Sequence, residues 1–343
     1  MLTPTAQEQV VVLQHGSAVD FLAVAYPTLR QHELSANIIL AHALKRAPTE
    51  YVLTDCQFLT DADIQLPPSS QPIPATDFWL TVWSHPAESP PVLDMALSCL
   101  HSSFGNYPIF LFTPVERSSL SPQWLSRRIG DAVAHLSACV QPERVFSVFG
   151  VASLVVPFAK VWTELTGFQP GEELYRAFFA FCTPRTFKTP VSTSMEHIVR
   201  RAAMFDAEEA GRLCQEFTNG SEYPLSPAQA ITEAEELIRK GQLWVSETIV
   251  GEIASICAVT RSSLHVSGIT KVYTTPNWRR KGFAQKLVQE VTQRLFECGK
   301  HGVVLYVGCE NNAKRVYERV GFLSEDSDVC LELGFVGTNV GHW

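Results

Sequence analysis

Apolar and polar positions recur with helical and strand-like periods along the second half of the chain. Between residues 282 and 299 the apolar side chains fall every three or four positions, as in an amphipathic helix with one buried face. The same period predicts helices over 206–217, 226–240 (with Ser226 as N-cap) and 313–320. Runs rich in Val, Ile and Thr predict strands over 198–202, 243–250, 251–260, 268–275, 303–307 and 329–335. The expected order is β-α-α-β-β-β-α-β-α-β, a mixed α/β fold in which the helix from 282 crosses over between two parallel strands.

Two polar, proline-containing segments interrupt the pattern. Residues 67–76 are typical of a surface loop, and residues 183–194 of a boundary between domains. A chain of 343 residues is long enough to hold two cores. We therefore expect an N-terminal domain over 1–182, a linker over 183–194 and a C-terminal domain over 195–343.

Composition narrows the classes of function. The formal net charge of −8 argues against a nucleic-acid partner or an anionic membrane surface for the chain as a whole. Nine scattered cysteines without a CxxC pair predict reduced thiols, and no zinc-ligand spacing occurs, so we expect no metal. The start of the sequence lacks a signal-peptide pattern, and the most apolar run, 145–159, is too short to span a bilayer. We expect a soluble cytoplasmic protein.

The sequence RRKGFA, residues 279–284, places three cations at the start of the strongest predicted helix. The exposed N–H groups of a helix N-terminus favour anions and disfavour Lys or Arg. A bound polyphosphate would accept those N–H groups and neutralise the cations together, and a glycine at 282 would let the backbone approach it. Neither a Walker loop nor a dinucleotide GxGxxG is present. A merely solvated basic helix start is the alternative that these six residues leave open.

Two motifs in order resemble one known family. Arg279-x-x-Gly282-x-Ala284 resembles the acyl-CoA signature of the GNAT superfamily of N-acetyltransferases, and NNAKRVYERVGF (311–322) resembles its second signature. The resemblance spans about residue 195 to the C-terminus and is nearest to the FR47-like and glycine N-acyltransferase-like branch. It implies the GNAT acyl-CoA N-acyltransferase fold.

The resemblance also implies a reaction and a site. The family moves an acetyl group from acetyl-CoA, its cosubstrate, to a primary amine on a small molecule or peptide, by direct attack on the thioester. Tyr317 matches the tyrosine that protonates the departing thiol; a core aromatic residue is the alternative interpretation. The remaining matches are the backbone that would pair with the pantetheine arm and the residues that would hold the pyrophosphate: Val272, Tyr273, Thr274, Arg279, Arg280, Lys281, Gly282, Phe283 and Ala284.

The match is incomplete in two respects. Many family members carry Asn seven residues before the tyrosine, where this chain has Glu310, followed by Asn311 and Asn312 as shifted candidates for the cofactor arm. The general base is not defined by any motif. Glu252, His265 and Glu310 are candidates, each equally compatible with a structural or solvated role. A conjugase that uses a larger acyl-CoA, or a catalytically silent acyl-CoA-binding or scaffold protein, stays open.

The first half of the chain contains an echo of the second. FAKVWTELTGF (158–168) matches NAKRVYERVGF (312–322) at five of eleven positions, and RRIGDA (127–132) echoes RRKGFA. Thr163 stands where the second half has Tyr317. We therefore expect a degenerate GNAT-like domain in tandem with the catalytic one; a coincidental likeness of amphipathic helices is the alternative.

Overall fold

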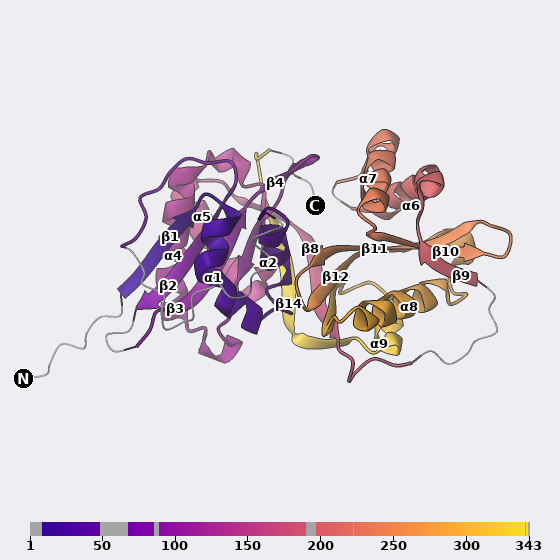
Figure 1. Ribbon diagram of the computed structural model, residues 1–343. Coiled ribbons are helices and arrows are strands. Elements are labelled where there is room, and N and C mark those ends of the chain that lie inside the picture. Colours follow the sequence, from indigo (N-terminus) through magenta and orange to yellow (C-terminus); the bar gives the residue numbers. More distant parts are fainter. Residues whose placement is uncertain are drawn as a thin grey trace, which may run out of the picture. The chain divides into compact units, whose positions relative to one another are not determined.

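A computed structural model describes residues 9–48, 68–85, 89–189, 197–221, 223–339 and 341, without the side chains of 325–328. Its contacts divide the chain into two compact units, one of residues 1–176 and 328–343 and the other of residues 177–327 (Figure 1). Both are mixed α/β, which confirms the predicted class. Positions 190–194 of the expected linker and Cys56 lie outside the described residues.

The second unit follows the predicted order closely. It consists of β9 (His197–Arg201), α6 (Ala207–Thr218), α7 (Pro227–Arg239), β10 (Leu243–Thr248), β11 (Ile253–Ser262), β12 (Val266–Thr274), α8 (Phe283–Glu297), β13 (Gly302–Gly308) and α9 (Lys314–Val320). Its sheet runs in the order β9-β10-β11-β12-β13, and of these pairs only β12–β13 is parallel. Ser226 caps α7, and its hydroxyl accepts from the N–H of Gln229.

Helices cover both faces of this sheet. Figure 1 shows α6 and α7 on one face and α8 and α9 on the other. Apolar side chains of α8 and α9, such as Leu287 and Val320, share one buried cluster with strands β11 to β13, and those of α6 and α7 form a second cluster with β10 and β11. Gln289, predicted on the polar face of α8, is buried instead, because its amide donates to the backbone oxygen of Lys188.

The last strand of each sheet comes from an unexpected part of the chain. Residues 177–182 of β8 (Pro170–Cys182) pair with β13 and belong to the second unit. Residues 330–334 of β14 (Leu323–Phe335) pair with β7 (Ser147–Val151) in the first unit. The contacts therefore divide the chain at 176 and 328 instead of at 183–194, because a strand belongs with the edge that satisfies its backbone. Nothing in the apolar pattern of 177–182 specifies that edge.

The first unit repeats the order of the second. It consists of β1 (Gln9–His15), α1 (Ala18–Gln31), α2 (Asn37–Leu44), β2 (Phe78–His85), β3 (Val92–Cys99), a small hairpin of β4 (His101–Ser102) and β5 (Gly105–Asn106), β6 (Ile109–Phe112), α4 (Pro122–Cys139), β7, α5 (Ala152–Thr166) and the start of β8. Its sheet runs β1-β2-β3-β6-β7-β14, and β6–β7 is its parallel pair. Each unit thus has one helical crossover between parallel strands.

Of the two sequence echoes, only the match of 158–168 with 312–322 aligns equivalent structural positions. Helices α5 and α9 both end at a left-handed glycine, Gly167 with φ 83° and Gly321 with φ 109°. A Cβ on Gly321 would lie 2.1 Å from the Thr186 carbonyl oxygen, so this position excludes side chains for two reasons. The other echo is wrong as a structural match, because 127–132 lies inside α4, which begins at Pro122 with Ser121 as its cap.

The division of the chain predicts which fragment folds. We expect residues 177–327 to unfold cooperatively in urea, whereas residues 195–343 lose the six-residue pairing of β8 with β13 and the buried side chains of Ala180 and Cys182. Circular dichroism during urea titration of the two fragments, with 195–327 as the matched control, measures this. Equal cooperativity and midpoints for 177–327 and 195–343 would contradict it.

Candidate active site

The two parallel strands of the second unit are paired only at their start. Residues 266–268 of β12 pair with 302–304 of β13, and no further pair joins them in the described part of the chain. Strand β13 continues to Gly308 alongside β8, and β12 continues to Thr274 alongside β11. Residues 269–274 therefore present backbone groups on the side facing away from β11, where an extended ligand with amide groups can bind as a strand does. Val272, Tyr273 and Thr274 all lie on this stretch.

The loop after β12 forms a turn at the start of α8, which we call the anion-binding turn after the role predicted for it. Pro276–Trp278 make one turn of 3-10 helix, and the backbone then enters the left-handed region twice, at Arg280 with φ 61° and at Gly282 with φ 85°. A left-handed arginine is uncommon, so this turn is a specific conformation. Gly282 is the N-cap of α8, no side chain caps the helix, and its first turn has no acidic residue. The first N–H groups of α8 are thus available to an anion.

Three cations surround this helix start. Arg279, Arg280 and Lys281 are all exposed. The Arg279 guanidinium donates to the Thr274 carbonyl oxygen at 3.1 Å and to the Tyr273 hydroxyl at 3.2 Å. The Lys281 ammonium lies 4.5 Å from the centre of the Trp278 ring. The predicted anion-binding residues are therefore brought together at the end of β12. Beyond residue 268, the edge of this strand that faces away from β11 has no strand partner among the described residues.

Phe283 differs from the rest of the predicted motif. Its side chain is buried, stacks on the His197 ring at 4.5 Å between centres and meets the edge of Trp278 at 5.1 Å. It can serve a ligand only through its backbone N–H, while Ala284 lies in the first turn of α8 beside it. Sequence analysis missed His197, because one histidine at the start of a short strand carries no pattern.

Burial governs the chemistry of His197. Neither ring nitrogen has a hydrogen-bond partner among the described residues. Burial, together with the positive charge of Lys286, lowers the pKa of His197 to about 4. The Lys286 ammonium donates to the His197 carbonyl oxygen. At neutral pH this ring is uncharged and serves as an aromatic surface for Phe283.

The second signature lies at the same end of the sheet. Helix α9 follows the carboxyl end of β13, which is parallel to β12, so both signatures meet beyond the carboxyl ends of the two strands. Tyr317 is buried in the cluster with Leu287 and Val307, as its place on the apolar stripe predicts. Asn311 and Asn312 are exposed in the turn before α9, where the Asn311 side-chain oxygen accepts from the N–H of Ala313.

The three base candidates are not brought together. Glu310 is exposed in the turn before α9, and Glu252 is exposed in the turn before β11, not on a central strand as its sequence context predicted. Strand pairing sets Ser255 opposite Thr274, at the end of β12 that leads into the anion-binding turn. Glu252, three residues before Ser255, therefore lies toward the same end of the sheet. His265 stacks on His301 at the other end of β12, roughly 30 Å along the strand from Thr274. The structure therefore places His265 at the opposite end of β12 from the anion-binding turn.

A polar cluster on the α6–α7 face of β12 was not predicted. The Lys271 ammonium lies 3.0 Å from a Glu233 carboxylate oxygen, and both side chains are largely buried. The Arg212 guanidinium binds Glu216 at 2.6 Å. Burial raises the pKa of the Tyr273 hydroxyl, and the Glu216 carboxylate raises it further, while Arg279 opposes both. Lys271 lies within the predicted strand 268–275, and this charged residue in an otherwise apolar and β-branched run was the sequence signal that could have indicated the cluster.

The three buried thiols of the second unit are not poised as nucleophiles. Burial raises the pKa of Cys257 and of Cys214 to about 12, and that of Cys182 to about 11, so all three are protonated at neutral pH. Cys309 is partly exposed. Within the described residues no group of three or more His, Cys, Asp or Glu side chains is placed to hold a metal ion.

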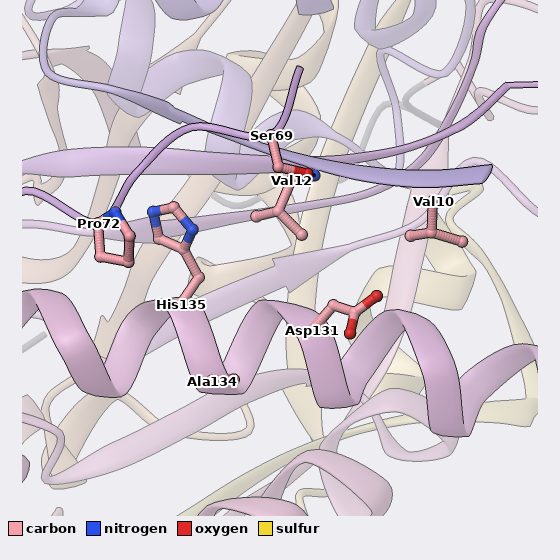
Figure 2. Close-up of a pocket in the computed structure, with 7 residues that line it drawn as sticks. All are labelled: Val10, Val12, Ser69, Pro72, Asp131, Ala134 and His135. Atoms are coloured by element: carbon pink, nitrogen blue, oxygen red, sulfur yellow. Dashed lines mark hydrogen bonds between the residues drawn. The ribbon is translucent and has the colours of Figure 1, made fainter.

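A separate cavity lies in the first unit. It measures about 390 Å³ and is a largely open hollow between β1 and α4 (Figure 2). Its lining is Val10, Val12, Ser69, Pro72, Asp131, Ala134 and His135. A His135 ring nitrogen lies 3.1 Å from the Gln14 side-chain oxygen, and burial lowers the pKa of His135. This lining lacks the unpaired strand and uncapped helix start of the second unit.

Comparisons with known proteins define the class of fold. Residues 250–330, which include both sequence signatures, match the model of the FR47-like protein family. All but the last three of these residues belong to the second unit, and FR47-like is the branch that the two signatures resemble. Among curated proteins, no sequence matches significantly.

Solved structures extend the likeness to the whole chain. A GCN5-related N-acetyltransferase of Sphaerobacter thermophilus is 13% identical with a TM-score of 0.52 and covers 99% of each chain. A Drosophila protein is 13% identical with a TM-score of 0.57, covering 94% of this chain and 95% of its own. A glucosamine N-acetyltransferase region in a fungal β-N-acetylglucosaminidase is 11% identical with a TM-score of 0.50, covering 96% of this chain and 38% of its own. No helix among the described residues has the length and apolarity needed to cross a membrane.

The buried ring of His197 predicts a pH dependence of stability. Its folded pKa of about 4 lies below the unfolded value of 6.5, so its contribution is fully present above pH 6.5 and is lost as the pH falls toward 4. We expect the urea-derived stability of His197→Phe to fall less than that of the wild type between pH 7 and 4.5, by about 2 kcal/mol. Equal losses in the two proteins would show that His197 is not held neutral.

Proposed function

We propose that the second unit transfers an acyl group, acetyl in the simplest case, from acyl-CoA to a primary amine. The observation that carries this proposal is the continuity of two features: the unpaired stretch of β12 leads directly into an uncapped helix start with three exposed cations. The first feature suits a ligand arm that contains amides, and the second suits a diphosphate. An acyl-CoA has both, in that order.

In this proposal the chain holds the cosubstrate mainly through its backbone. The amides of the pantetheine arm pair with residues 272–274, and the diphosphate accepts the first N–H groups of α8. Arg279, Arg280 and Lys281 neutralise its charge. The thioester then lies toward Gly268, where β12 and β13 part.

The transfer needs three groups around the thioester. The neutral amine nitrogen attacks the carbonyl carbon and gives up one proton to the general base, so that a C–N bond forms and the C–S bond breaks. The departing thiolate takes a proton from the Tyr317 hydroxyl, which regains one from solvent. Support for Tyr317 is its buried position on α9, beyond the carboxyl end of β13. Direct attack also fits the raised pKa values of the buried thiols, none of which is a ready nucleophile.

The base and the acceptor are proposed from position. Glu252, His265 and Glu310 all stay base candidates. Glu252 and Glu310 lie toward the anion-binding end of the sheet, whereas His265, three residues before Gly268, lies at the end of β12 toward which the thioester is proposed to point. The acceptor side is expected along 206–240. There Glu235 and Glu236 form exposed pairs with Arg239 and Lys240, so they act as helix-surface charges. Glu208 and Glu209 occupy the first turn of α6, which favours acidic residues.

We also propose that the first unit is a copy without an acyl-CoA site. It has the same order of elements, but the start of α4 is capped by Ser121, whose hydroxyl accepts from the Trp124 N–H. Arg128 is buried, and its guanidinium binds Asp94 at 2.6 Å. Thr163, in the position of Tyr317, donates to the Phe168 carbonyl oxygen. These residues support the helix end and the core, so no cation faces an open helix start here.

Acyl transfer is tested by release of free thiol from acetyl-CoA in the presence of a panel of primary amines. We expect turnover with at least one amine, and a loss of CoA affinity of about ten-fold or more in Arg280→Met/Lys281→Met, since each cation lies at the proposed diphosphate site. Lys160→Met/Lys188→Met in the same assay is a charge-matched control. CoA binding without turnover on any amine would favour the silent binding protein, and turnover confined to longer acyl-CoA would favour the conjugase.

Tyr317→Phe tests the general acid separately from binding. Without the hydroxyl we expect kcat to fall by about 10²-fold or more while the Kd for CoA stays within about two-fold, because the ring still fills the core. The fall should be smaller with an acyl donor whose leaving thiol is more acidic. Unchanged kcat with acetyl-CoA would assign Tyr317 to the core alone.

A further inference from the structure

We propose that Trp278 and Tyr273 are positioning residues that hold the cations of the anion-binding turn in place before a ligand arrives. This rests on the proposed acyl-CoA site and adds residues that do not touch the acyl group. The inference comes from four aromatic rings that pack around the turn, each with a measured partner.

The first set of contacts begins at Lys281 and ends in the core. The Lys281 ammonium sits 4.5 Å from the centre of the Trp278 ring, Trp278 meets Phe283 edge to face at 5.1 Å, and Phe283 stacks on His197 at 4.5 Å. Phe283 and His197 are both buried, and His197 is fixed in β9. An exposed, flexible lysine is thereby tied to a rigid part of the unit through three rings in series.

The second set holds Arg279. Its guanidinium lies 5.4 Å from the centre of the Tyr273 ring and donates both to the hydroxyl of that ring and to the Thr274 carbonyl oxygen. Tyr273 is itself packed against the cluster of α6 and α7, where Glu216 influences its hydroxyl. Two cations of the turn, on either side of the left-handed Arg280, thus rest on rings anchored in different parts of the core.

This packing has a thermodynamic consequence. Lys and Arg side chains lose much rotamer freedom when a ligand fixes them, and that loss weakens binding. A side chain already held on a ring has lost part of this freedom beforehand, so the turn binds an anion more tightly than three mobile cations would. Each cation–ring contact at an exposed site corresponds to about a two- to five-fold change in affinity.

In the first unit, too, a cation lies against a tryptophan ring, but its charge is used differently. Arg128 lies 4.6 Å from the centre of the Trp124 ring, but its guanidinium is buried and bound to Asp94 and the Ser84 hydroxyl. There the arginine is neutralised within the core. In the second unit the ring holds the cation at the surface and leaves its charge available.

The test measures the Kd of coenzyme A and of pantetheine, which lacks the diphosphate, by isothermal titration calorimetry on the full chain. We expect Trp278→Leu to weaken coenzyme A binding by about two- to five-fold and to leave pantetheine binding unchanged. Trp278→Phe keeps a ring and should recover most of the affinity. Phe205→Leu removes an exposed ring that lies 5.3 Å from Arg200, away from the turn, and is the matched control with no expected effect.

A double-mutant cycle separates positioning from general damage. If Trp278 acts through Lys281, Trp278→Leu combined with Lys281→Met should weaken coenzyme A binding by clearly less than the product of the two single effects. Multiplicative effects, or equal weakening of coenzyme A and pantetheine, would overturn the inference even if both variants have wild-type thermal stability. Failure of the wild type to bind coenzyme A would instead overturn the proposed function.

Discussion

The second unit depends on the incomplete pairing of two parallel strands. Strands β12 and β13 share hydrogen bonds over 266–268 and 302–304 and then separate, each keeping a full antiparallel partner on its other side. Those outer partners stabilise the strands, so the inner edge of β12 can stay unpaired without loss of the sheet. Because unpaired backbone groups need partners, this edge favours a ligand that can behave as a strand.

The helix after β12 adds charge to that edge. Its start lacks both a side-chain cap and an acidic residue, and the left-handed turn at 280 and 282 directs the chain into the helix. The strand supplies neutral hydrogen-bonding groups and the helix start supplies positive ones. A ligand with an amide-containing arm and an anionic end matches both the strand edge and the helix start. These two features lie on one continuous segment of the chain, residues 266–284.

The two units share one arrangement of elements but differ at the helix that links their parallel strands. Both have a helical crossover between parallel strands, and both have a helix that ends at a left-handed glycine. In the first unit a serine satisfies the helix start, and the nearby arginine is bound by Asp94 in the core. The two units therefore differ in how their cations are neutralised. In the first unit Asp94 binds the Arg128 guanidinium in the core, whereas in the second unit residues 279–281 stay exposed at the helix start.

The sequence by itself determined the elements, the fold class and the two signatures, because helical period, β-branched runs and helix-start chemistry are local. It grouped residues 279–284 at one helix start, where the structure brings them together, whereas anion binding there and the acid role of Tyr317 stay predictions. Tertiary structure alone decided that residues 177–182 complete the sheet of the second unit, that 127–132 lies within a helix, that His265 is far from the turn and that His197 supports Phe283. These four features depend on which sheet edge a strand joins and on which rings meet in the core. Such contacts join residues that are far apart in the sequence, so they do not produce a periodic pattern of apolar and polar residues.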